Sequence, residues 1–302
     1  MKLNNLNIIL ISFIVLIFSN NSYSAIYCSA PAADSDCSDS ICDLQSALAD
    51  AEASSEDDEI NLEQGTYNVP SGVHFTYISS DSGSLIVSGG WNSSCLSQTG
   101  DSGTTELVGI SPAAATDTFG GVLDISINNA SASDLEISNL TVRNGTAIDD
   151  GGGINIDHFT GGRLNINLNN LQVLNNVAGQ EGGGIEIFDW VTNGGINVNI
   201  SECLISGNDA NTSGPGGIDI IADTTNVADP STIGITLAGN TILNNTADSY
   251  GGAMYIDPDG SDAIIYNNVI AGNSVTGVSF ADGGGINFSP FSGGNAIITN
   301  NT

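Results

Sequence analysis

The stretch EGGGIEIFDW, residues 181–190, decides the fold because close copies of it recur along the chain. The closest copies are DGGGINID (150–157) and DGGGINF (282–288), and weaker copies are GPGGIDI (214–220) and YGGAMYI (250–256). The first apolar residues after the glycines are 31, 33, 36 and 32 residues apart; they are Ile154, Ile185, Ile218, Met254 and Ile286. A near-fixed period of this length is typical of a solenoid, in which each repeat packs on its neighbours.

The repeats are made of strands. After each glycine cluster the apolar residues alternate with polar ones, which is the period of a strand with one buried face. A second alternating segment reads LNINL (164–168), INVNI (196–200) and IGITL (233–237), and a third segment is flanked by asparagines. Three short strands per repeat predict a triangular coil, with successive coils paired in parallel. We therefore expect an all-β parallel β-helix with stacked apolar side chains inside.

Glycine and asparagine mark the predicted corners of each coil. Glycine adopts backbone angles that other residues resist, and asparagine tolerates left-handed angles. Stacked asparagines can also hydrogen-bond from coil to coil, so we interpret both sets as structural. The positions are Gly152, Gly183, Gly217, Gly252 and Gly284, and Asn144, Asn175, Asn208, Asn245 and Asn273. A phosphate-binding glycine loop is the functional alternative, but neither a Lys nor a strand–loop–helix context supports it.

The charge balance narrows the range of partners. The 302 residues include 34 Asp and Glu but only three Lys and Arg, for a net charge of −31. Binding to nucleic acid or to an anionic membrane surface needs clustered basic residues, so both are excluded as partners. The regular alternation of Ile, Val and Leu argues against disorder.

The N-terminus predicts export. Lys2 precedes the apolar run IILISFIVLIF (8–18), and small residues follow, so residues 1–24 are expected to be a signal peptide cleaved after Ser24. No later stretch is long and apolar enough to span a membrane. We expect a cap region at 25–59 and the β-helix at 60–302, secreted or held at a cell surface.

Export also predicts disulfides. Four cysteines near the mature N-terminus allow two bridges in three possible connectivities; they are Cys28, Cys37, Cys42 and Cys95. Their spacing matches no zinc motif. Cys203 stands alone within the repeats and is expected to be a buried thiol.

These motifs resemble right-handed parallel β-helix proteins, the group that includes pectate lyases and many bacterial surface proteins. GGAM (251–254) with nearby asparagines is similar to the repeats of polymorphic outer membrane proteins, and VSGGWNSSC (87–95) resembles a Gly-Gly-aromatic step of secreted members. Residues 43–69 resemble the N-terminal part of such helices, where an amphipathic helix covers the open end; here its apolar positions are Leu44, Ala47, Leu48 and Ala51. The resemblance covers residues 43–302 and implies a right-handed coil at a bacterial surface or outer membrane. It leaves the function open, because one scaffold hosts many activities.

Two classes of function remain. The first is a non-catalytic protein for adhesion or for binding extracellular glycans or a host surface. The second is a polysaccharide lyase or a glycoside hydrolase. The resemblance implies that a lyase would use calcium and a basic residue, for which Arg143 is the candidate. A hydrolase would need two carboxylates, and Glu186 and Asp219 are expected on neighbouring coils about 4.8 Å apart. The paired-Asp and Gly-His-Gly motifs of β-helix polygalacturonases are missing, and we expect a non-catalytic protein.

Calcium is the one cofactor that the sequence suggests. Glu186 with Asp219, and Asp150 with Glu181, are acidic pairs on neighbouring coils that could share a proton or hold a cation. The turn DPDGSD offers Asp257, Asp259 and Asp262 in the manner of half a calcium loop, with a plain turn as the alternative.

Two tryptophans have two possible roles each, and two histidines match no functional motif. Trp91 and Trp190 are either sugar-stacking platforms or packing residues. His74 and His158 match no ligand or triad spacing.

The last ten residues, GGNAIITNNT, align with GSDAIIYNNV (260–269), 33 residues earlier. In this alignment Asn301 takes the position of Asn268, and the chain stops before the next core strand. We therefore expect the solenoid to be incomplete at its C-terminus.

Overall fold

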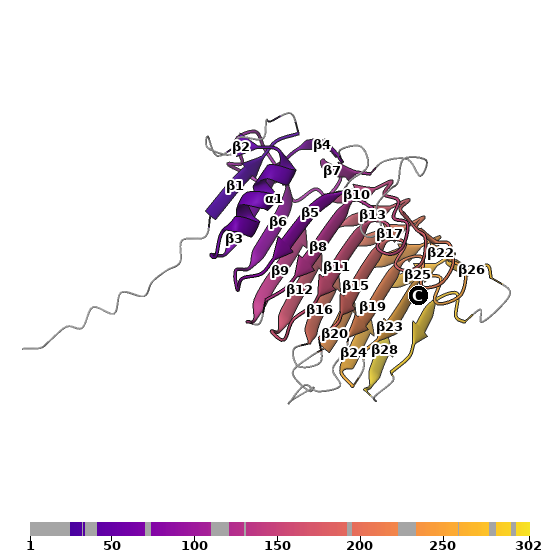
Figure 1. The fold of residues 1–302 in the computed structure, drawn as a ribbon. Helices are drawn as coiled ribbons and strands as arrows, with labels where there is room; N and C mark the ends of the chain where they lie inside the picture. The colour runs from indigo at the N-terminus through magenta and orange to yellow at the C-terminus, as the bar shows by residue number, and fades with distance from the viewer. Residues whose placement is uncertain are drawn as a thin grey trace, which may run out of the picture.

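The computed structural model describes residues 25–31, 33, 41–69, 74–109, 121–129, 131–191, 195–222, 234–258, 260–277, 282–290 and 294–302. The expected signal peptide, Cys37 and Asp259 lie outside these residues. The described chain is a right-handed parallel β-helix with one helix near its N-terminal end, as the repeats and the resemblance together lead one to expect (Figure 1).

Among the described residues, the strands form three long sheets and one short sheet. Sheet A has the order β2 (Ile41–Cys42), β1 (Ala25–Ser29), β3 (Asp58–Glu63), β6 (Leu85–Trp91), β9 (Ser133–Ser138), β12 (Leu164–Asn169), β16 (Ile196–Ser201), β20 (Gly234–Ala238), β24 (Asp262–Tyr266) and β28 (Ala296–Thr299). Sheet B consists of β4 (Gly65–Asn68), β7 (Thr105–Val108), β10 (Thr141–Arg143), β13 (Gln172–Leu174), β17 (Leu204–Ser206), β21 (Thr241–Leu243) and β25 (Val269–Ala271).

Sheet C contains the strands that follow the glycine clusters. They are β5 (Phe75–Ser79), β8 (Leu123–Ile127), β11 (Ile154–His158), β15 (Ile185–Asp189), β19 (Ile218–Ala222), β23 (Met254–Asp257) and β27 (Ile286–Phe288). A short fourth sheet lies between B and C, with β14 (Val177–Ala178), β18 (Asp209–Ala210), β22 (Thr246–Ala247) and β26 (Ser274–Val275). These coils therefore have a short fourth strand beyond the three that the sequence predicts.

The strand register of sheet C confirms the alignment on the first apolar residue after each glycine cluster. Ile154 pairs with Ile185, Ile185 with Ile218, and Ile218 with Met254. These side chains are fully buried and form one stack inside the coil. The stack continues from coil to coil, so no single repeat has a core of its own.

The asparagine alignment was wrong by one residue in the first coils. Asn176, and not Asn175, donates its backbone N–H to Asn208 Oδ1, at 2.9 Å. Asn144 and Asn175 instead have left-handed angles, with φ of 58° and 54°, and share this conformation with Gly207. The repeat therefore places a left-handed residue first and a ladder residue immediately after it.

The ladder residues are buried and join successive coils. The side-chain oxygens of Asn208, Asn245 and Asn273 each accept two hydrogen bonds, one from the backbone N–H and one from the amide of the preceding ladder residue, at 2.9–3.0 Å. The ladder consists of Asn176, Asn208, Asn245 and Asn273. A second ladder contains Asn240, Asn268 and Asn301. Buried amides satisfied in this way hold the corners of neighbouring coils in register.

Glycines at the corner before sheet C have two distinct roles. Gly182 has a left-handed φ of 59°. Gly183 has no such angle, but a Cβ there would lie 2.5 Å from the carbonyl oxygen of Asp209 on the next coil. Gly152, Gly183, Gly217 and Gly252 are therefore required by close coil-to-coil packing and not by their backbone angles, whereas a Cβ at Gly284 would meet nothing closer than 3.2 Å.

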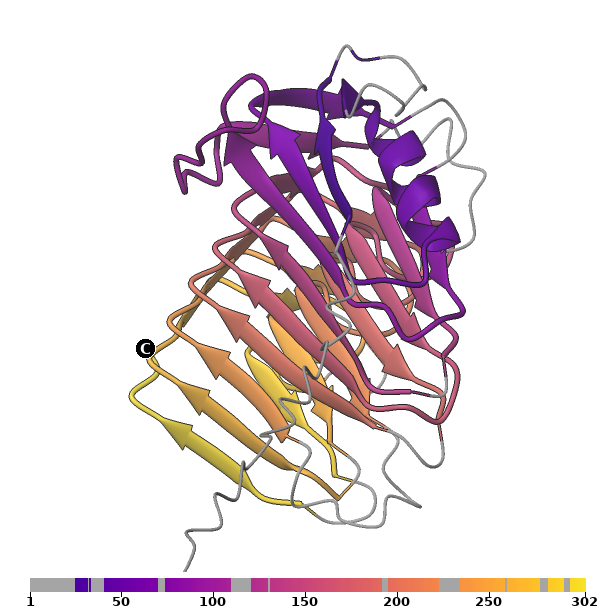
Figure 2. The same cartoon turned by 90° about the vertical axis from the view of Figure 1, so that its left-hand side faces the viewer.

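The N-terminal helix forms where the sequence predicts it. Helix α1 (Leu44–Ala53) buries its four expected apolar side chains, and Asp43 caps it by accepting the Ser46 N–H at 2.9 Å. The side chain of Gln45 exchanges two hydrogen bonds with the backbone of Thr76 and fixes the helix to β5. Figure 2 shows α1 at the N-terminal end of the stack.

The cysteines form disulfides close to this end. Cys28 on β1 is bonded to Cys95 in the turn after β6, with Cα atoms 5.7 Å apart, and Cys42 is also disulfide-bonded. Cys203 is a free, buried thiol, as expected. Within the part of the chain that the structure describes, no helix has the length and apolar character of a membrane span.

Candidate functional site on the outer face of sheet C

Two rows of outward-facing residues cross sheet C, because its strands pair in register. The row nearer the glycine corners reads Asp124, Asn155, Glu186, Asp219, Tyr255 and Asn287, and the row beyond it reads Ser126, Asp157, Phe188 and Ile221. The predicted neighbours Glu186 and Asp219 are directly paired residues of β15 and β19.

Several members of the first row are buried although they point away from the core. Asn155, Glu186 and Asp219 are 1%, 3% and 1% exposed. The glycine corners cover them: a Cβ added to Gly182 would clash with Glu186 Oε2. The corner that turns the chain therefore also encloses a carboxyl group.

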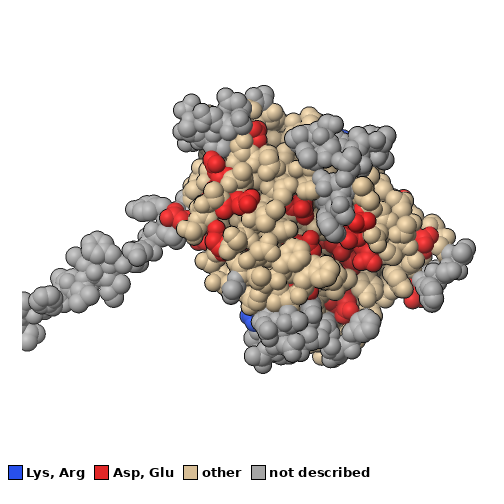
Figure 3. Space-filling model, in the orientation of Figure 1, with Lys and Arg blue, Asp and Glu red and all other residues tan. Residues whose placement is uncertain are grey.

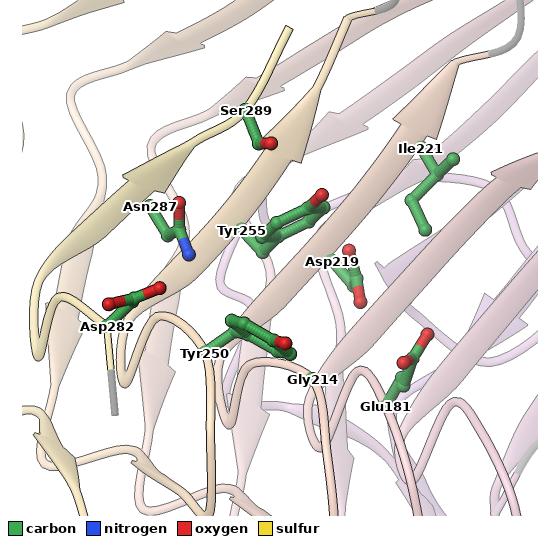
Figure 4. Close-up of a pocket in the computed structure, with 9 residues that line it drawn as sticks. All are labelled: Glu181, Gly214, Asp219, Ile221, Tyr250, Tyr255, Asp282, Asn287 and Ser289. Carbon is green, nitrogen blue, oxygen red and sulfur yellow. The ribbon is translucent and has the colours of Figure 1, made fainter. Parts of the chain in front are cut away.

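Three carboxyl groups meet at this point. One oxygen from each of Glu181, Glu186 and Asp219 lies within 4.8 Å of the other two. The atoms Glu186 Oε2 and Asp219 Oδ1 are buried and have no hydrogen-bond partner. Figure 4 shows Glu181 and Asp219 side by side on adjacent coils. Asp150 lies next to them and accepts the backbone N–H of Glu181 at 3.2 Å.

Burial dominates the electrostatics of this cluster. It raises the pKa of Glu186 well above its usual value, and the neighbouring Asp219 carboxylate raises it further. The pKa of Asp219 is raised in the same way, by burial first and then by Glu181 and Asp150. The pKa of Asp150 is raised to about 6, again mainly by burial. Two buried carboxyl groups this close therefore either share a proton, so that only one is ionised, or hold a cation between them.

Two hollows flank the cluster. The first, of about 340 Å³, is shown in Figure 4 and is bordered by Asp219, Tyr250, Tyr255 and Asp282. The second, of about 460 Å³, extends along the sheet past Glu186 and Asp157 to Trp190. Glu181 borders both hollows, so the cluster is reached from either side. Figure 3 shows acidic side chains gathered on this face of the molecule.

An aromatic platform forms the far wall of the second hollow. The Trp190 ring stacks on Phe188, with ring centroids 4.3 Å apart, and on Phe159 at 6.1 Å. Trp190 is 56% exposed and Phe159 is 42% exposed, so both rings present surface to solvent. Trp190 Nε1 donates to Asp157 Oδ1 at 3.1 Å, which fixes the orientation of the indole.

A polar row lies beside the platform and is held in place by its own hydrogen bonds. Asn155 Nδ2 donates to Asp157 Oδ2 at 2.8 Å and to Asp124 Oδ1 at 2.9 Å. These carboxylates keep further oxygen lone pairs for a ligand, because each oxygen can accept more than one hydrogen bond. The hollow therefore combines a flat apolar surface with several fixed acceptors.

The lyase candidate lies elsewhere. Arg143 is on sheet B and forms an ion pair with Glu106, with a distance of 2.9 Å between Nη2 and Oε2. Among the described residues that line the two hollows of sheet C, there is no Lys or Arg. The structure thus does not bring Arg143 to the carboxylates.

The predicted calcium turn is described only in part, so the calcium site there stays a prediction. Asp257 is buried at the end of β23, whereas Asp262 is exposed and accepts two hydrogen bonds from Asn295. In the described part of the chain, neither belongs to a group of three ligand-type side chains whose donor atoms lie within 4.8 Å of one another. Asp259 lies outside that part.

The sequence pattern locates Glu186, Asp219 and Trp190 but misses the residues around them. Phe188 follows the same outward alternation as Glu186, so its place beside the site was readable from the period of the strand. Phe159 lies just beyond the end of β11, and no periodic signal points to it. Trp91 is partly buried at the end of β6, where its Nε1 donates to Ser88, and this favours the packing interpretation.

The two histidines pair with aspartates that short-range spacing rules do not reveal. His158 Nδ1 lies 2.9 Å from Asp189 Oδ1 inside the coil, and His74 Nε2 lies 3.3 Å from Asp124 Oδ2. His158 and Asp189 are directly paired residues of β11 and β15, so the 31-residue step between these coils was the signal that could have found this contact.

Comparisons with protein-family models, with characterised proteins and with solved structures find no match for this chain. The chemistry of the site is therefore inferred from its own side chains.

Proposed function

We propose that this chain is an exported, acidic β-helix protein that binds neutral glycans along the outer face of sheet C and does not turn them over. The observation that carries the proposal is the Phe159–Phe188–Trp190 platform beside the fixed acceptors Asp157 and Asp124. The signal-peptide pattern and the similarity to outer membrane repeats support a place at a bacterial surface, where such binding would serve adhesion.

The platform suits a sugar ring. One face of a pyranose carries C–H groups and packs on an aromatic ring, while its hydroxyl groups donate hydrogen bonds from the edge. A half-exposed Trp190 with an oriented indole offers that surface at low entropic cost, since its ring is already fixed by Asp157. The hollow of about 460 Å³ lies in the size range of small-ligand sites.

The charge of the hollow favours a neutral glycan over an acidic one. Its rim contains several carboxylates, which accept hydrogen bonds from hydroxyl groups and repel uronate or sulfate groups. The same argument disfavours a lyase, because β-elimination needs a group that neutralises the carboxylate of the substrate.

A second candidate function is hydrolysis of a neutral glycan. Glu186 and Asp157 border the same hollow, and burial raises the pKa of both carboxyl groups, that of Glu186 well above its usual value. A protonated and an ionised carboxyl group together are what a glycoside hydrolase requires.

The test is a glycan array and titration calorimetry with the purified protein and with Trp190→Ala. We expect Trp190→Ala to weaken binding by about two- to ten-fold, because one stacking contact contributes on the order of 0.5–1.5 kcal/mol. Tyr266→Ala removes an exposed aromatic ring from sheet A and is the matched control, expected to bind like the unaltered protein. Equal binding by all three proteins would contradict the proposal.

Hydrolysis is followed in parallel as the release of reducing ends. We expect none. Turnover that is lost in Glu186→Gln would establish the hydrolase in place of the binding protein.

A further inference from the structure

We propose that Glu181, Glu186 and Asp219 form a binding site for one divalent cation of the calcium type, which joins two neighbouring coils. Its ligands belong to the buried cluster and not to the aromatic platform, although Glu181 and Glu186 also border the hollow beside that platform.

The spacing of the carboxyl oxygens fits a single ion. Calcium binds oxygen at about 2.3–2.6 Å, so two oxygens on the same ion lie at most about 5 Å apart. One oxygen from each of the three residues lies within 4.8 Å of the other two. Glu181 and Glu186 come from one coil and Asp219 from the next, so an ion at this point would bond across the coil-to-coil interface.

The second observation is that two of these residues each carry a buried carboxyl oxygen without a partner. Glu186 Oε2 and Asp219 Oδ1 accept no hydrogen bond, although their residues are 3% and 1% exposed. A buried polar atom without a partner costs free energy, and a buried pair of like charges costs more. A cation bound by both oxygens removes the two costs together.

The ligand set selects the kind of cation. Three carboxylates without His or Cys favour a hard ion bound by oxygen over zinc or copper, which prefer nitrogen and sulfur ligands. Magnesium requires a near-octahedral shell at about 2.0–2.1 Å and retains water, whereas calcium accepts irregular geometry. The two hollows give an ion and its remaining water ligands access from solvent.

The surroundings strengthen the attraction for a cation. Asp150 faces the cluster from the corner before β11, and Asp157 and Asp257 face it from β11 and β23. Among the described residues that border the cluster, none is a Lys or Arg that could take the place of the ion.

Calorimetry and thermal melts in EDTA and in millimolar calcium, at matched ionic strength, test the site. We expect one saturable calcium site per chain and a rise in melting temperature of roughly 5 °C or more, because an ion that binds only the folded state stabilises it. Magnesium at the same concentration is expected to have a smaller effect. Affinity is expected to fall as the pH is lowered, because protons compete for the same carboxyl oxygens.

Variants separate this site from general screening of the acidic surface. Glu186→Gln and Asp219→Asn each remove one charge while keeping the side-chain size. We expect both to lose at least ten-fold in calcium affinity, and to melt above the unaltered protein in EDTA because the buried repulsion is gone. Glu136→Gln, the same change on sheet A, is the control and should keep the full calcium response.

Three results would overturn the proposal. They are the lack of saturable binding, several weak equivalent sites, or a calcium response in Glu186→Gln equal to that of the unaltered protein. Glu181→Gln alters a partly exposed ligand at the rim, so it tests the affinity even if a buried substitution prevents folding.

Discussion

At the scale of single residues, Cys203 takes the place of an asparagine in a ladder of asparagines. Its backbone N–H donates to Asn240 Oδ1 at 2.9 Å, as the backbone of Asn240 does to Asn268. Its sulfur accepts the Leu171 N–H at 3.4 Å, where an asparagine oxygen would lie in any later coil. Burial raises the pKa of the thiol to about 12, so it is unreactive in the folded protein.

This position predicts opposite outcomes for two substitutions. Cys203→Asn should leave stability unchanged or raise it by about 1 kcal/mol, because an amide satisfies the Leu171 N–H with a stronger acceptor. Cys203→Ala should cost about 1–2 kcal/mol, because it leaves that N–H without an acceptor. Urea unfolding measures both. An asparagine variant less stable than the alanine variant would show that Cys203 is not a ladder residue.

At the scale of structural elements, the glycine corner before β15 both turns the chain and shields an outward-facing carboxyl group from solvent. Gly182 has a left-handed backbone and lies against the carboxyl group of Glu186. The substitution Gly182→Ala should therefore cost about 2 kcal/mol or more, because it combines backbone strain with a steric clash.

Two other glycines separate these two costs. Gly100 has a φ of 68° but open space where the methyl group of an alanine would lie, and Gly161 has open space and no left-handed angle. Gly100→Ala should cost about 1 kcal/mol and Gly161→Ala close to nothing. Thermal melts of the three variants in one buffer provide the comparison, and equal losses at Gly182 and Gly100 would refute the steric explanation.

The elements also show what the sequence could predict. The register of sheet C could be predicted from Ile154 and the equivalent apolar residues of later coils. A strand with one buried face cannot shift by one residue without exposing its apolar side chains. The adjacency of Glu186 and Asp219 followed from that register. The ladder could not be placed with the same certainty, because Asn175 and Asn176 are identical neighbours and only their contacts distinguish them. The burial of Glu186 was hidden as well, since it depends on the path of a glycine corner in three dimensions.

At the scale of the whole molecule, buried acids determine how stability responds to pH. The pKa values of Asp58 and Asp150 are raised to about 6 by burial, and those of Glu186 and Asp219 are raised as well. A raised carboxyl pKa means that the folded state holds its proton more tightly than the unfolded state does. The resulting stability is complete below the unfolded value of about 4 and is lost as the pH rises through the folded values.

In EDTA, we therefore expect the melting temperature to fall as the pH rises from about 4 through about 6 and beyond. The net charge of −31 adds repulsion in the same direction, so added sodium chloride should reduce the fall without abolishing it. Glu186→Gln should flatten the profile. Scanning calorimetry across this range measures the effect, and a melting temperature that rises with pH in EDTA would contradict the assignment.

The ladders have a consequence for the molecule under force. In the ladder that contains Asn208, the backbone N–H of one coil donates to the amide oxygen of an asparagine in the next coil. Each coil is therefore stabilised by the coil that follows it. Force applied to the C-terminus would unfold the coils one at a time, each while the preceding coil is still folded. Each step would release about 32 residues, or roughly 110 Å of extended chain. A tether built in this way would lengthen stepwise under load, and each unfolding step would dissipate part of the mechanical work.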